Sequence, residues 1–172
     1  MSVVINGSAG VTTNSGAVYD GIQSATAQAS TSGTSIDFTS IPSWVKRVTV
    51  MFSGVSLSGT SSILVQLGDA GGIETTSYVS GTSRVSTVVG IDEPTNGFIV
   101  YLASATRAAD GAITFSNLTG NTWVGSGVLY NGNSTVQVGG KKALSDVLTQ
   151  VRITTVNGTD TFDAGSINIL YE

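Results

Sequence analysis

The densest group of side chains that could bind a cation lies in residues 157–163. Asn157, Asp160 and Asp163 place an amide and two carboxylates within this segment, and calcium prefers oxygen ligands of this kind. The spacing of an EF-hand loop and its acidic final ligand are both missing. In the alternative interpretation, which we favour, the segment is a polar loop in which Asp160 and Asp163 accept turn hydrogen bonds. We therefore expect no resident metal.

A second acidic group, Asp92 and Glu93, would be catalytic only if it faced another carboxylate across a cleft. Glycosidases need two carboxyl groups about 5 to 9.5 Å apart, and the sequence cannot place this pair opposite Asp69 or Glu74. The chain has no histidine and no cysteine. The commonest general base, thiol nucleophiles and zinc–thiolate sites are thereby excluded. Glycine-rich residues 68–72 lack the Lys-Ser/Thr ending of a phosphate loop. We expect no enzyme activity and no cofactor.

Aromatic side chains offer a different chemistry, because an aromatic face can stack on the apolar face of a sugar ring. Trp44 follows a proline turn, and Tyr78 and Tyr130 lie near polar loops. Trp44, Tyr78 and Tyr130 are therefore the candidate contacts for a glycan. Trp123 lies in a hydrophobic run, and core packing is the favoured interpretation for it.

The composition favours contact with other protein chains. Hydrophobic residues make up 40% of the chain and charged residues only 10%, against about 25% charged in typical soluble proteins. Ser, Thr, Asn and Gly must therefore cover much of the surface. Few charges would have to be desolvated when such a surface meets another protein. We take this as an indication of assembly.

The charge and hydropathy patterns exclude several partners. The net charge is −4, with only 7 Lys and Arg residues, so we expect no nucleic-acid partner. The N-terminal sequence has neither the basic start nor the apolar core of a secretory signal. No apolar run approaches the roughly 20 residues needed to span a bilayer, so we expect no membrane insertion.

Residues 36–55 predict the central element of the fold. Val48, Val50 and Phe52 alternate with polar or less apolar residues, as expected for a strand with one buried face. Similar short runs predict further strands over residues 24–29, 73–79 and 85–91, and Ser53 and Gly54 predict a loop after the central strand. Residues 112–118 and 122–130 flank a Thr-Gly-Asn turn that predicts a hairpin. With 22 glycines and 2 prolines, the sequence predicts an all-β protein, an antiparallel β-sandwich of the jelly-roll type.

The N-terminal segment differs from this pattern, and we divide the chain into an arm, residues 1–23, and a sandwich domain, residues 24–172. N-cap candidates at 13–15 are compatible with one or two helical turns that would place Val18 and Ile22 on one side. An ordered loop is the alternative. In either case Val18, Tyr19 and Ile22 are candidate assembly residues that would need a neighbour, such as the same segment of another subunit.

Three stretches together resemble a β-rich module of tailed bacteriophages and prophages. They are VTTNSGAVYDGIQ near the start, a long stretch that contains IPSWVKR and LGDAGGIE, and VRITTVNGTDTFDAGSINILYE at the end. This module is found at the end of tail-fibre proteins and as small separate virion proteins. The resemblance covers about two thirds of the chain and is weakest between residues 79 and 144.

The resemblance implies a structural protein of the virion, made in the host bacterial cytoplasm and displayed in several copies. A short copy of the module fits a small tail fibre, a fibre tip or a head-decoration protein. Other virion proteins would be its partners, and a homotrimer is expected because phage fibres are commonly trimers. The family offers no catalytic motif to transfer. The alternative function is a receptor-binding module that recognises carbohydrate on the host surface.

Overall fold

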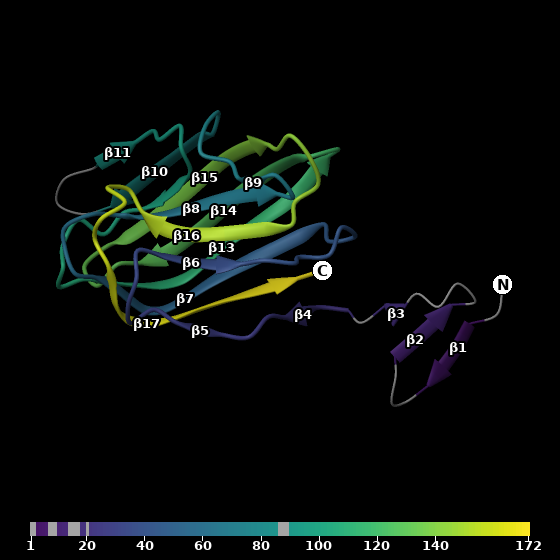
Figure 1. Ribbon diagram of the computed structural model, residues 1–172. Helices are drawn as coiled ribbons and strands as arrows, with labels where there is room; N and C mark the ends of the chain where they lie inside the picture. Colours follow the sequence, from purple (N-terminus) through teal and green to yellow (C-terminus); the bar gives the residue numbers. More distant parts are fainter. Residues whose placement is uncertain (1–2, 7–9, 14–17, 20, 86–89) are drawn as a thin grey trace.

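The computed structural model describes residues 3–6, 10–13, 18–19, 21–85 and 90–172. Within these residues the secondary structure consists of strands in three sheets, and the paired strands run antiparallel. Two of the sheets pack face to face (Figure 1). The prediction of an all-β antiparallel sandwich is confirmed. No helix in the described ranges is long and apolar enough to cross a membrane.

The larger sandwich sheet has nine strands among the described residues. In spatial order it contains β11 (Gly90–Asp92), β10 (Val79–Val85), β15 (Thr135–Ala143), β14 (Thr122–Tyr130), β13 (Ala108–Thr119), β7 (Arg47–Leu57), β17 (Phe162–Tyr171) and β4 (Gln23–Ser24), while β5 (Gln28–Ala29) also pairs with β17.

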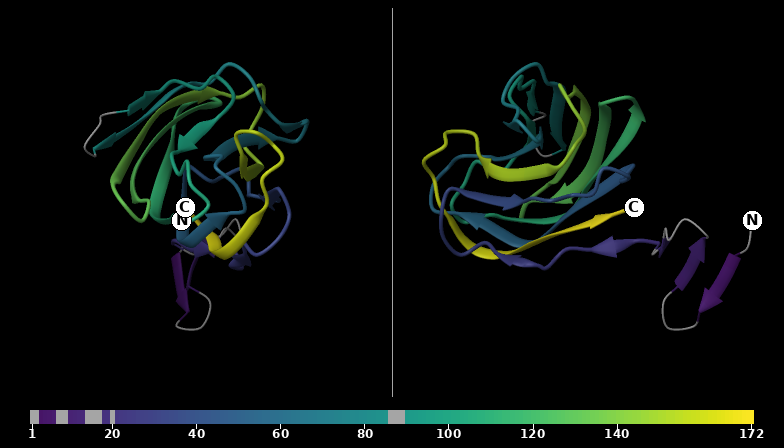
Figure 2. Two further views of the ribbon diagram at one scale, coloured as in Figure 1. Left: turned by 90° about the vertical axis from the view of Figure 1, so that its left-hand side faces the viewer. Right: turned by 45° about the vertical axis from the view of Figure 1, so that its right-hand side comes forward.

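The smaller sandwich sheet covers one face of the larger one. Its spatial order is β12 (Phe98–Val100), β8 (Ile63–Asp69), β16 (Gln150–Thr155) and β6 (Ser35–Phe38), and β9 (Gly72–Ile73) pairs with β8. Every residue of β8 is buried. Figure 2 shows the larger sheet curving around the smaller one.

The core lies between these two sheets and is built from alternate residues of the long strands. Phe98 of the smaller sheet meets Phe115 of the larger sheet edge to face, with ring centroids 4.9 Å apart. Trp123 is 3% exposed, which confirms its predicted place in the core. Because alternate residues of β13 and β14 point inward, their other residues must form an outer face.

The N-terminal segment forms a small sheet of its own. It contains β1 (Val3–Asn6), β2 (Gly10–Thr13) and β3 (Val18–Tyr19), which pair with one another and with no strand of the sandwich sheets in the described residues. Figure 1 shows this sheet outside the sandwich. The helical turns considered for this segment are wrong at Val18–Tyr19, since pairing with β2 stabilises an extended backbone there. Residues 14–17 and 20 lie outside the described residues.

Strand β7 is longer than the sequence pattern predicts. We expected a loop from Ser53 and Gly54, but β7 continues to Leu57. Gly54 takes a φ of 62°, and the register of β7 shifts against both of its neighbours near this point. Glycine tolerates such a conformation, so the strand bends through a bulge without ending.

Other element boundaries also moved. The predicted hairpin of residues 112–118 and 122–130 is confirmed, as β13 and β14. The predicted strand over residues 73–79 is wrong between 74 and 78, where the chain crosses from β9 to β10. The strand predicted for residues 24–29 is interrupted, and only its ends pair with β17. Of the weak strand predicted for 85–91, residues 86–89 lie outside the described part of the chain.

Candidate functional site

The outer face of the larger sheet presents two adjacent rows of uncharged residues. The strand registers align one row, here called the Ser126 row, across six strands: Gly81, Gly139, Ser126, Thr114, Thr49 and Leu170. The Val128 row lies beside the Ser126 row, two residues away from it on each strand. It consists of Ser83, Gln137, Val128, Ala112, Met51 and Asn168. All twelve residues are partly or fully exposed.

The two rows differ in side-chain size. Near its centre the Ser126 row consists of Gly139, Ser126 and Thr114, so it forms a shallow depression. The Val128 row places Gln137, Val128 and Met51 beside that depression, and the Val128 side chain is 58% exposed. On β15, β14 and β7 the Val128 row therefore rises above the Ser126 row, while on β13 the order is reversed because Ala112 is smaller than Thr114.

Charged groups flank these rows. At one end of the face, Lys141 lies beside Val124 in the register, and Arg47 forms an ion pair with Glu172. At the other end, Asp110 lies opposite Tyr130 and accepts a hydrogen bond from the backbone N–H of Gly54 at 2.8 Å. Because Glu172 neutralises Arg47, Lys141 leaves an excess of positive charge among these residues at the first rim. The other rim carries the carboxylate of Asp110.

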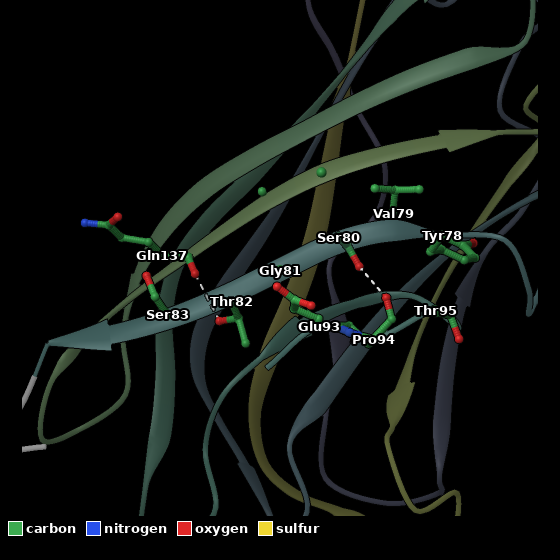
Figure 3. A pocket seen from close by; sticks show the side chains of 12 residues that line it. Tyr78, Val79, Ser80, Gly81, Thr82, Ser83, Glu93, Pro94, Thr95 and Gln137 are labelled. Atoms are coloured by element: carbon green, nitrogen blue, oxygen red, sulfur yellow. Dashed lines mark hydrogen bonds between the residues drawn. The ribbon is translucent and has the colours of Figure 1, made fainter. Parts of the chain in front are cut away.

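A pocket of about 700 Å³ opens where this face reaches β10. Gly81 and Gly139 line it, together with Ser83, Gln137 and Glu93 (Figure 3). Glycine exposes its backbone here, and an added Cβ at Gly139 would meet nothing closer than an oxygen 3.9 Å away. The volume falls in the range of about 300 to 1,000 Å³ that is usual for ligand sites.

Hydrogen bonds hold one wall of the pocket in place. The hydroxyl of Ser80 lies 3.0 Å from the carbonyl oxygen of Pro94 and 2.7 Å from that of Gly97. The backbone N–H of Tyr78 donates to the carbonyl oxygen of Thr95 at 3.0 Å. The segment at 94–97 is therefore fixed against β10, and the pocket is preformed.

A buried polar cluster lies next to the pocket wall. Lys142 pairs with Glu74, and its ammonium group lies 5.1 Å from the centre of the Tyr78 ring. Burial raises the pKa of Tyr78. By itself burial would also raise the pKa of Glu74, but hydrogen bonds from Lys142 and from Ser145 outweigh it and lower that pKa. The cluster joins the 74–78 crossing to β15.

The candidate glycan contacts do not converge on one place. Trp44 is 50% exposed and packs against Tyr171 at the end of the sheet where β7 begins. Tyr130 is exposed at the opposite end, on β14. Tyr78 is 2% exposed and its hydroxyl accepts a hydrogen bond from the N–H of Leu67. Its ring is a core element and offers no face to a sugar.

The candidate assembly residues lie at the base of the arm. Val18 and Tyr19 form β3, and their side chains lie outside the described part of the structure. Ile22 is 61% exposed and borders a small cavity together with Thr114 and Leu170. Ile22 therefore adjoins the Ser126 row, a link that the sequence did not indicate.

The acidic candidates have separate surroundings. Asn157 accepts hydrogen bonds from the backbone N–H groups of Thr159 and Asp160, so the segment forms a polar turn. The expectation that Asp160 and Asp163 accept turn hydrogen bonds is wrong, because they accept from distant segments, Asp160 from the N–H of Ser61 and Asp163 from the hydroxyl of Ser56. Asp69 lies close to Glu74 beside Ser145. The side chain of Asp92 lies outside the described residues, and Glu93 borders the pocket.

The sequence reasoning missed the two rows, although part of their signal was present. Val124, Ser126, Val128 and Tyr130 alternate along β14 as one exposed face, and that run contains no charge. Which residues of other strands continue each row depends on registers between distant segments. Comparison of the chain with protein-family models, curated proteins and solved structures finds no match.

Proposed function

We propose that the chain is a structural protein of a tailed-bacteriophage particle, a small tail fibre, fibre tip or head-decoration protein displayed in several copies. It acts by packing against other virion proteins and other copies of itself, with no chemical step. The phage-module resemblance of the sequence supplies the class of protein, and the architecture supports it.

The observation that carries this proposal is the separation of the arm from the sandwich. Among the residues whose burial the structure describes, the buried apolar core begins at Ile36 and closes between the two sandwich sheets. The three strands of the arm pair only with each other in the described residues. A sandwich with its own core can be displayed, while the arm is available to contact other chains. Residues 1–23, with Val18, Tyr19 and Ile22, are the proposed attachment and trimer-forming segment.

The test is to locate the chain on particles. Antibodies against the sandwich should label tailed particles from the strain that carries the coding sequence, as seen by immunogold electron microscopy. The full-length protein should add back to particles that lack it, and a version without residues 1–21 should fold but fail to add. Absence of the chain from purified particles would refute the proposal.

The preformed pocket favours a second candidate function, binding of host-surface carbohydrate. Residues with hydroxyl, amide and carboxylate groups line it together with glycines, and sugars are recognised by such polar groups. Soluble host-surface oligosaccharides should then shift the NMR signals of Ser83 and Gln137, and changing Glu93→Ala should weaken the effect. Shifts confined to Trp44 or Tyr130 would place a sugar elsewhere.

A further inference from the structure

We infer that the Ser126 row and the Val128 row pack against the same rows of a second copy, related by a two-fold axis that runs along the rows. The inference rests on the proposed display of several copies, and it names the surface by which copies pair. Twelve aligned positions without a charge need little desolvation of charge when they are covered.

The order of the rows makes the face complementary to itself. The two-fold axis lies between the two rows and parallel to them. It places each strand of one copy over the same strand of the other copy, and the two strands run in opposite directions. The Ser126 row of one copy then faces the Val128 row of the other, and on β15, β14 and β7 the larger side chains of the Val128 row meet the smaller ones of the Ser126 row. An isologous contact requires this kind of self-complementarity.

Strand β14 shows the match at the centre of the face. Its outward residues are Val124, Ser126, Val128 and Tyr130. Under the two-fold operation Ser126 faces Val128 of the second copy, and Val124 faces Tyr130. The exposed ring and both valines, of which Tyr130 is 53% and Val128 58% exposed, are buried by one contact.

The pocket gains an occupant from the same operation. Gly139 and Gln137 both lie on β15, in the Ser126 row and the Val128 row respectively. Gln137 of the second copy therefore lies over Gly139, which lines the pocket and leaves room for a side chain. Figure 3 shows Gln137 at the rim of the pocket on its own copy.

Charge and area agree with this arrangement. Reversed strands bring the rim that carries Lys141 toward the rim that carries Asp110, whereas a contact with parallel strands would bring like charges together. Six strands about 4.8 Å apart, over roughly seven residues of about 3.3 Å each, cover at most on the order of 700 Å², since this face is convex where the sheet curves around the smaller one (Figure 2). A standard interface uses about 800 Å² per partner.

The first experiment compares solution masses of full-length chains by light scattering over a dilution series. Val128→Asp places a charge at the centre of the contact, and its mass should be half that of the unchanged chain, whether the arm holds one chain or three chains together in each half. Leu118→Asp is the matched control, because Leu118 is 66% exposed outside the two rows and should leave the mass unchanged. Equal masses for Val128→Asp and the unchanged chain, or an unchanged chain that is already monomeric, would overturn the inference.

A second experiment tests the axis itself. The chain has no cysteine, so a Ser126→Cys chain and a Val128→Cys chain each carry one thiol. Under mild oxidation the mixture should give a higher yield of disulfide-linked dimer than either chain oxidised alone, because each thiol faces the other position on the second copy. Equal yields in all three samples would rule out the proposed register, even if Val128→Asp had failed to fold.

These outcomes are separate from those of the proposed function. A chain that pairs through this face but is absent from phage particles would leave the inference standing and refute the virion role. A chain that is present on particles but stays monomeric, with its pocket signals shifted by soluble saccharide, would refute the pairing and favour the carbohydrate function.

Discussion

The ammonium group of Lys142, a side chain only 2% exposed, lies 2.5 Å from Oε2 of Glu74 and donates a hydrogen bond to the carbonyl oxygen of Thr76 at 2.9 Å. Lys142 belongs to β15 of the larger sheet, whereas Glu74 and Thr76 belong to the crossing from β9 to β10. The pair therefore fastens a segment without strand pairing to the sheet that forms the pocket wall.

The two members of this pair should differ in their effect on stability. Glu74→Gln leaves a buried ammonium without its counter-charge, and such a loss costs about 3 kcal/mol or more. Lys142→Met keeps the apolar stem and frees Glu74, which is 22% exposed, to turn toward water, so its cost should be smaller. Urea unfolding of both variants measures the difference. A larger loss for Lys142→Met would contradict this account of the pair.

Acid should weaken the fold through Glu74 and Asp69. Hydrogen bonds from the Ser145 hydroxyl and the Gly71 N–H lower the pKa of Asp69, and the pKa of Glu74 is lowered as described above. A carboxyl group with a depressed folded-state pKa stabilises the fold above its unfolded value of about 4 and loses that contribution as the pH falls through the folded value.

The thermal midpoint should therefore drop below about pH 4, and a chain with Asp69→Asn and Glu74→Gln should show a smaller drop from its own neutral value. Differential scanning fluorimetry across the acid range provides the measurement. Parallel pH profiles for the two chains would show that other groups control acid unfolding.

Two glycines on neighbouring strands should respond differently to alanine. A Cβ at Gly125 would lie 2.6 Å from Cε1 of Phe115 and 3.1 Å from Cε1 of Phe98, so Gly125→Ala overpacks the core at a cost of about 1 to 3 kcal/mol. Gly139 points outward, and Gly139→Ala should change the free energy of unfolding by less than about 1 kcal/mol. Chemical denaturation gives both values, and similar losses would mean that the face assignment is wrong.

The ion pair of Asp37 and Arg152 should contribute little. The guanidinium makes two hydrogen bonds of 2.7 Å to the carboxylate, but the two side chains are 35% and 37% exposed. Solvent screening limits such pairs to about 1 kcal/mol or less. We expect Asp37→Ala to lower the unfolding free energy by no more than this, and salt to reduce the difference. A loss as large as that of Glu74→Gln would contradict the ranking.

Local patterns predicted the local parts of the fold. The turn at 119–121 between two alternating runs identified the β13–β14 hairpin, and the hydrophobic surroundings of Trp123 identified it as core. Gly54 was interpreted as the end of a strand because glycine marks loops and bulges alike. Only the pairing of β7 with both β13 and β17 decides between them.

The candidate site was less predictable than the fold. A tyrosine next to a polar loop looks the same in sequence whether its ring is exposed, as in Tyr130, or buried, as in Tyr78. The two uncharged rows combine the consecutive strands β13, β14 and β15 with β7, β10 and β17, which are distant from them in the chain. Composition indicated a low-charge surface, but the registers that align Gly81 with Leu170 arise only from the folded sheet.

The place of β17 beside β7 also bears on how the chain reaches its fold. The hairpins of β13, β14 and β15 join neighbouring segments and can form early. The pairing of Val48 in β7 with Tyr171 in β17 joins distant segments and can form only after β17 has been synthesised. Pairings between such distant segments form slowly. Until β17 arrives, one edge of β7 is open along an eleven-residue strand with alternating buried residues. Open edges of this kind pair with other chains, so misfolding during synthesis should begin at the β7 edge.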